Sequence, residues 1–70
     1  MTRFLYLKIA GSTVYEIKHF TDRSAGLKYV HEQSGTSTPI DALWSNQWHR
    51  ASAFQVLGGI EHLLYEVEIY

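Results

Sequence analysis

The chain contains no cysteine, and this absence removes two ways of stabilising a small domain. Without thiols there is neither a disulfide framework nor a thiolate metal site. A chain of 70 residues buries only about 60% of the surface that it exposes when unfolded. Its stability must therefore come from one hydrophobic core, alone or together with an oligomer interface. We expect a single domain over residues 1–70.

An excess of charge of one sign and a long apolar run are also lacking. Six Lys and Arg residues stand against seven Asp and Glu residues, a net charge of −1. This balance argues against a strong attraction to nucleic acid or anionic lipid, and against an acidic mimic of DNA. No segment approaches the roughly 20 apolar residues that span a membrane, and residues 1–12 lack the apolar core of a signal peptide. We therefore predict no membrane partner and a cytoplasmic location.

The residues that are present are those of a folding chain, with 46% hydrophobic and 14% aromatic residues. Residues 3–10 and 13–20 are rich in β-forming residues and are separated by the turn signal Gly11-Ser12, which predicts a hairpin. Residues 62–70 alternate between apolar and polar and predict another strand. We expect this last strand to pair with the first, because both have the strongest β pattern.

Two helices are predicted between the hairpin and the last strand. The first begins after Thr21 or Asp22, runs to about Gln33, and ends before Gly35, which suits the left-handed position after a helix. The second runs from Pro39 to about His49, because proline is favoured at the first helical position. Its apolar residues recur on one face: Ile40, Leu43, Trp44 and Trp48.

Two smaller features of this region also lead to expectations. Gly26 is costly inside a helix, and we expect it to let the first helix pack close to the sheet. Residues 51–59 are ambiguous. Ser52 and Gln55 fit a capping box and favour a short helical turn, but the same residues fit a strand with Gly58-Gly59 as a hairpin turn. We favour the helical turn.

The element order β-β-α-α-β predicts an α+β fold, a three-stranded mainly antiparallel sheet with two helices packed on one face. Alternation divides the side chains of each strand between two faces. We expect the helices to cover the face that carries most of the aliphatic residues: Leu5, Leu7, Ile9, Tyr15, Ile17, Leu63, Tyr65, Val67 and Ile69.

The opposite face is then left without cover, and it mixes aromatic rings with charges of both signs. Its aromatic residues are Phe4, Tyr6, Phe20 and Tyr70. One interpretation is a solvated face with scattered aromatics. Another is a surface for a protein partner or for self-association, because aromatics are enriched in interface cores.

A third interpretation is that these rings stack on nucleobases, as in sheets that bind RNA. The basic residues nearby are Lys18, Arg23 and Lys28. Carboxylates on the same face oppose the approach of phosphate, so nucleic acid is the less favoured partner.

Both tryptophans lie in the stretch WSNQWHR, residues 44–50. Trp44 falls near the middle of the apolar stripe and is expected in the core. Trp48 lies at its edge, and both a core position and a partner-facing position stay open. Gln47 falls inside the stripe, where a buried amide needs hydrogen-bond partners. If that end of the helix is not fully buried, Gln47, Trp48 and Arg50 form a rim cluster of the residue types common in binding hot spots.

Residues that carry chemistry do not converge in the sequence. No two of the four histidines lie within four residues of each other, so no element supplies a preformed pair of metal ligands. His31 and His62 are expected at the surface. Asp41, Ser45 and His49 share a helix face, but nothing predicts a pocket or oxyanion donors beside them. We expect no metal, no cofactor and no enzymatic activity.

The sequence therefore predicts a non-enzymatic protein-interaction module that docks on a larger protein partner and blocks it. Small chains of this kind occur among inhibitors encoded by phages and mobile elements, such as anti-defence proteins, which is an analogy of size and class. The alternatives are a homodimeric structural module and a weak nucleic-acid-binding domain.

Overall fold

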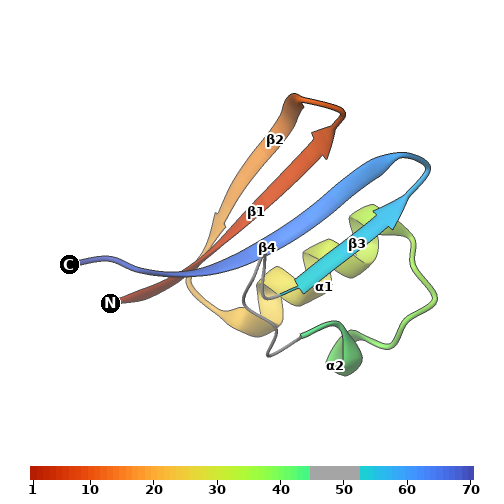
Figure 1. Ribbon diagram of the computed structural model, residues 1–70. Helices are drawn as coiled ribbons and strands as arrows, with labels where there is room; N and C mark the ends of the chain where they lie inside the picture. Colours follow the sequence, from red (N-terminus) through yellow and green to blue (C-terminus); the bar gives the residue numbers. More distant parts are fainter. Residues whose placement is uncertain (45–52) are drawn as a thin grey trace.

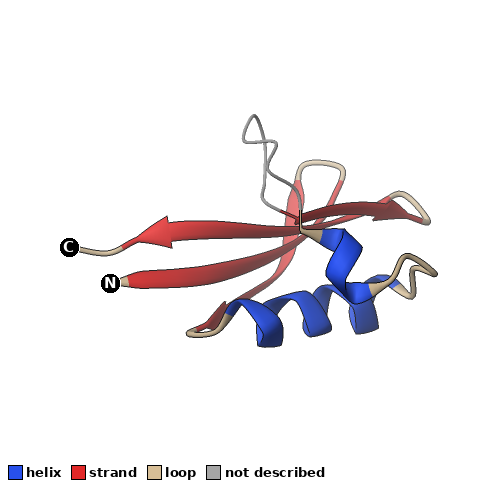
Figure 2. Ribbon diagram, turned by 90° about the horizontal axis from the view of Figure 1, so that it is seen from below, coloured by secondary structure: helices blue, strands red, loops and turns tan. Residues whose placement is uncertain are grey.

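A four-stranded antiparallel sheet and two helices make up the part of the chain that the structure describes. The structure is a computed structural model, and it describes residues 1–44 and 53–70. The elements in chain order are β1 (Thr2–Ala10), β2 (Thr13–Phe20), α1 (Arg23–Ser34), α2 (Ile40–Leu43), β3 (Ala53–Leu57) and β4 (Ile60–Glu68) (Figure 1). The strand order is β2-β1-β4-β3. Figure 2 shows α1 lying along one side of the sheet.

The hairpin, the first helix and the pairing of the outermost segments of the chain confirm the sequence predictions. Gly11 has a φ of 63° in the turn between β1 and β2, a conformation that glycine adopts at little cost. Gly35 ends α1 in the left-handed conformation, and its backbone N–H donates to the carbonyl of His31. The central pair of the sheet is β1 with β4, which run antiparallel from Thr2 opposite Glu68 to Ala10 opposite Ile60.

Two predictions for the segment after α1 are wrong. The second helix covers only Ile40–Leu43, because the backbone of Trp44 is already extended, with φ −74° and ψ 126°. The rest of the helix predicted to His49 lies outside the described residues. Residues 53–57 form a strand instead of the favoured helical turn, so the sheet has four strands, not three.

The turn from β3 to β4 explains why the strand alternative is the correct one. Gly58 and Gly59 both have positive φ, as a tight hairpin connection requires. With that turn in place, Val56 and Leu57 extend the sheet by pairing with Glu61 and Ile60. The glycine pair and the β-forming residues before it outweigh the capping-box pattern.

The core lies between α1 and the sheet, and the helix approaches the strands closely. Its buried residues are Phe4, Tyr6, Leu27, Val30, Leu43, Ala53 and Leu64. A Cβ atom at Gly26 would lie 3.0 Å from both terminal methyl carbons of Leu64. The expectation that Gly26 allows close packing is therefore confirmed.

The helices cover the face of the sheet that the sequence analysis left open. Phe4 is 8% exposed and Tyr6 is fully buried, whereas Ile17, predicted in the core, is 64% exposed. The assignment of residues to two faces is correct over most of the sheet, but the choice of the covered face is reversed. Aromatic rings explain the reversal, because each buries roughly 150–250 Å² and three of them lie on the covered side.

The close contact at Gly26 gives a first testable prediction. Gly26→Leu adds four carbon atoms beside Leu64, the first of them 3.0 Å from its methyl carbons, and overpacking of this kind costs about 1–3 kcal/mol. We expect the free energy of unfolding, measured by urea denaturation, to fall by that amount although leucine favours helix more than glycine does. Ala25→Leu, at the exposed neighbouring position, is the matched control and should leave stability nearly unchanged. A Gly26→Leu protein as stable as the parent would contradict the packing described here.

Candidate functional site

The side of the sheet that faces away from α1 is mostly apolar. The strand register places the following residues on it, and we call this set the helix-free face: Arg3, Leu5, Leu7, Ile9, Val14, Ile17, His19, Val56, Glu61, Leu63, Tyr65 and Val67. Only Arg3, His19 and Glu61 in this set bear an acidic or basic side chain. Neither helix of the described chain lies over this face (Figure 2).

Apolar surface on the helix-free face is most accessible along its two margins. Ile17 on β2 is 64% exposed and Val56 on β3 is 50% exposed. The residues of the two central strands are half-buried by their neighbours, as Leu5, Leu7 and Tyr65 are, and Leu63 is buried. Exposed apolar side chains on one face, joined by half-buried apolar residues, mark an association site more often than an isolated apolar residue does.

A bulge in β2 adds one residue to this face that alternation alone does not place there. Lys8 lies opposite Glu16 and Ile9 lies opposite Val14, so Tyr15 is left without a partner on β1. The extra residue shifts the alternation of β2 by one position. Val14 therefore joins Ile9 on the helix-free face instead of following Glu16 to the side of α1.

The predicted partner-binding residues are not gathered into one surface. Phe4 and Tyr6 belong to the core, which corrects their placement on an uncovered face. Phe20 is half-buried and packs against the core, with its ring centroid 5.4 Å from that of Tyr29. Tyr70 is fully exposed beyond the end of β4. The rim cluster of Gln47, Trp48 and Arg50 lies outside the described residues.

A buried hydrogen bond joins two titratable residues beneath α1. The hydroxyl of Tyr6 and Nδ1 of His62 lie 2.8 Å apart, and both side chains are closed off from solvent. Burial raises the pKa of Tyr6 well above its usual range. Burial, reinforced by the charge of Lys8, lowers the pKa of His62 below its ordinary value. His62 is therefore a neutral core residue at physiological pH, which corrects its expected place at the surface.

A second polar cluster lies at the edge of the core, between β2 and α1. The hydroxyl of Tyr29 donates a hydrogen bond to the carboxylate of Glu16, and this bond is the main cause that raises the pKa of Tyr29. Nζ of Lys18 lies 4.5 Å from the centroid of the Tyr29 ring, in cation–π contact. These contacts fix the orientation of Tyr29 and seal the edge of the core beside Phe20.

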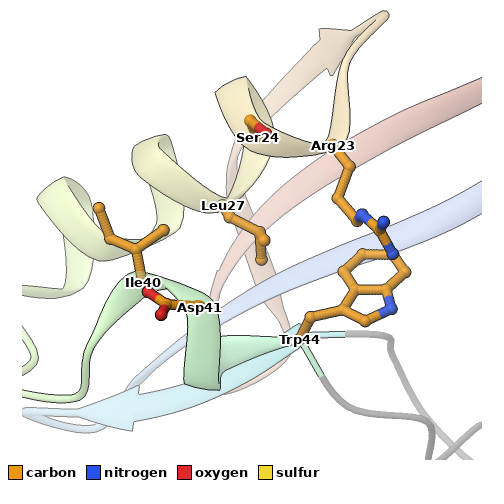
Figure 3. A pocket seen from close by; sticks show the side chains of 6 residues that line it. All are labelled: Arg23, Ser24, Leu27, Ile40, Asp41 and Trp44. Atoms are coloured by element: carbon orange, nitrogen blue, oxygen red, sulfur yellow. The ribbon is translucent and has the colours of Figure 1, made fainter.

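A groove of about 430 Å³ opens between the start of α1 and α2. Its lining residues are Arg23, Ser24, Leu27, Ile40, Asp41 and Trp44 (Figure 3). The guanidinium carbon of Arg23 lies 4.9 Å from the centroid of the Trp44 ring, and the rings of Trp44 and Phe4 meet edge to face with centroids 6.0 Å apart. Trp44, expected in the core, is half-buried and packs against the core from its edge. Trp44 is the last described residue before position 53, so we assign no ligand to the groove.

Metal binding and membrane insertion find no support in the described residues. Within residues 1–44 and 53–70, no group of three or more His, Asp or Glu side chains is placed to hold a metal ion. Neither helix of that part of the chain has the length and hydropathy that crossing a bilayer requires.

Comparisons with known proteins add nothing to the interpretation, which therefore rests on the geometry of the chain itself. No protein-family model, no curated protein and no solved structure matches this chain.

The buried state of His62 predicts how stability depends on pH. The unfolded chain binds a proton at His62 near pH 6.5, whereas the folded chain resists protonation there, so the unfolded state binds more protons below that pH. Stability therefore rises with pH through this window and is lost as the pH falls from about 6.5 toward the lower folded value. We expect urea midpoints to decrease from pH 8 to pH 5.5, with His62 contributing at most about 1.4 kcal/mol per pH unit.

Two substitutions isolate the contribution of His62. His62→Gln removes the titrating group and should flatten this part of the pH profile, even if the protein is less stable at every pH. Ala25→Gln, which introduces the same residue at an exposed position of α1, keeps His62 and should leave the slope unchanged. An unaltered slope in His62→Gln would show that His62 is not the group responsible.

Proposed function

We propose that this chain is a non-enzymatic protein-interaction module that docks on its partner through the helix-free face. The observation that carries the proposal is that the helix-free face of the sheet is mostly apolar, while α1 and α2 both lie on the other side. A domain of two layers normally places polar residues on the outer side of its sheet. Here that side carries exposed aliphatic residues instead, such as Ile17 and Val56.

The layout of the helix-free face resembles that of a protein interface. Its apolar centre on β1 and β4 is bordered by Arg3, His19 and Glu61. Interfaces combine an apolar core with a polar rim and favour aromatic residues such as Tyr65 near the centre. A complementary partner would present an apolar patch with charges at its border.

The interior polar groups support a binding role over a catalytic one. The titratable pair Tyr6 and His62 is closed off from solvent, so no substrate reaches it in the folded state. A general acid or base must lie within hydrogen-bond reach of the proton that it transfers. The pair instead satisfies the polar atoms that the aromatic core buries.

The proposal extends to the consequence of docking. We propose that the chain blocks a larger protein by covering part of its surface, in the manner of small inhibitors encoded by phages and mobile elements. This extension rests on the analogy of size and class.

A substitution on the helix-free face tests the proposal. A tagged form of the chain is used to capture binding proteins from its source cells, and the affinity of the purified pair is then measured. Ile17→Lys places a charge on exposed apolar surface, where it leaves the fold intact but must be desolvated on binding. We expect the dissociation constant to rise at least about tenfold, as for a residue at an interface centre.

The matched control carries the same new residue on the opposite side of the molecule. Ala25→Lys adds a lysine to the exposed side of α1 and should leave the dissociation constant unchanged. Circular dichroism establishes that both variants fold. Equal affinity of the parent and of Ile17→Lys would remove the helix-free face as the docking surface.

A further inference from the structure

We infer that the occupant of the helix-free face is a second copy of this chain, packed sheet against sheet. The inference rests on the proposed docking through the helix-free face, and it names a second copy, in place of the larger protein, as the occupant of that face. In the resulting dimer the two sheets form the inner layers, and each α1 lies on the outside. The argument has three parts: the size of the face, its charge pattern and the net charge of the chain.

The size of the face fits a dimer interface. Three spacings of about 4.8 Å, with half a spacing added at each edge, make four strands about 19 Å wide, and a nine-residue strand that rises about 3.3 Å per residue is about 30 Å long. Since β1 and β4 each have nine residues and β3 is shorter, the plane of the face covers about 500 Å². Two copies would bury about 1,000 Å² in the plane alone, before the relief of the side chains is counted, and this is the threshold for a specific interface.

The charge pattern of the face is self-complementary under a two-fold axis. Arg3 lies near the start of β1, while Glu61 lies opposite Ile9 near the other end of that strand. A two-fold axis across the strands, between Leu5 and Leu7, places the Arg3 end of one copy against the Glu61 end of the other. The two charged residues are then offset by one strand, about 4.8 Å, which an arginine side chain can bridge.

Such an arrangement forms two equivalent Arg3–Glu61 contacts on either side of an apolar centre, as an isologous interface requires. Glu61 already takes part in an interaction within its own chain. A carboxylate has about four acceptor sites, so it can accept from the guanidinium of the second copy as well.

The overall charge of the chain opposes self-association only weakly. The net charge is −1, so the repulsion between two copies is small at physiological ionic strength. The helix-free face itself carries one arginine and one glutamate, which balance within each copy.

Sedimentation of the full chain tests the inference, with lysines placed at opposite margins of the face. Ile17→Lys lies on β2 and Val56→Lys on β3, the two outer strands of the sheet. We expect the parent chain to sediment as a dimer at tens of micromolar. Each variant should raise the dimer dissociation constant at least about tenfold, because every dimer contains the new lysine twice. Ala25→Lys, on the exposed side of α1, should dimerise as the parent does.

The outcomes separate this inference from other modes of association and from the proposed function. A dimer that dissociates in only one of the two lysine variants would be an edge-to-edge dimer, and a dimer that persists in both would use another surface; either result overturns the inference. A parent chain that remains monomeric at a concentration on the order of 100 μM also overturns the inference, because its dissociation constant would then be weaker than that concentration. If that monomer loses a captured partner in Ile17→Lys, the proposed function stands while the second copy is excluded.

Discussion

The packing of α1 against the aromatic side of the sheet decides which surface this small protein offers to other molecules. The helix has twelve residues and a length of about 18 Å. It lies along one side of the sheet, and the other side is left uncovered by any helix of the described residues (Figure 2). Gly26 brings it close to Leu64, and the rings of Tyr6 and Tyr29 meet edge to face with centroids 4.9 Å apart. Once these groups are enclosed, the aliphatic side of the sheet still exposes apolar residues such as Ile17 and Val56.

Much of the fold follows from local patterns in the sequence. Alternation located β1, β2 and β4, and glycines at positive φ marked the turns and the end of α1. Alternation also sorts side chains into two faces, but it does not say which face is inside when both carry large apolar residues. The size of the aromatic residues Phe4, Tyr6 and Phe20 indicates which face is buried. The bulge at Tyr15 has no comparable signal, because it depends on how β1 and β2 pair.

The candidate site was less predictable, since it is defined by what the core leaves over. His62 stands among apolar and acidic residues in an alternating strand and has the pattern of a surface residue. Its hydrogen-bond partner Tyr6 lies 56 positions away, so the contact arises only when β1 and β4 pair. Because the covered face is the reverse of the expected one, Tyr6 is buried, while Leu5, Leu7 and Ile17 lie on the helix-free face and not in the core. The proposed docking surface is therefore this aliphatic face and not the aromatic one.

The edges of the sheet bear on how far association can proceed. β2 is interrupted by its bulge at Tyr15 and bears Glu16 and Lys18, and β3 is only five residues long. Bulges, charged side chains and short length make an outer strand a poor template for a foreign strand. The protein can therefore expose an apolar sheet surface without promoting fibril growth, because both edge strands disfavour the addition of further strands by hydrogen bonding.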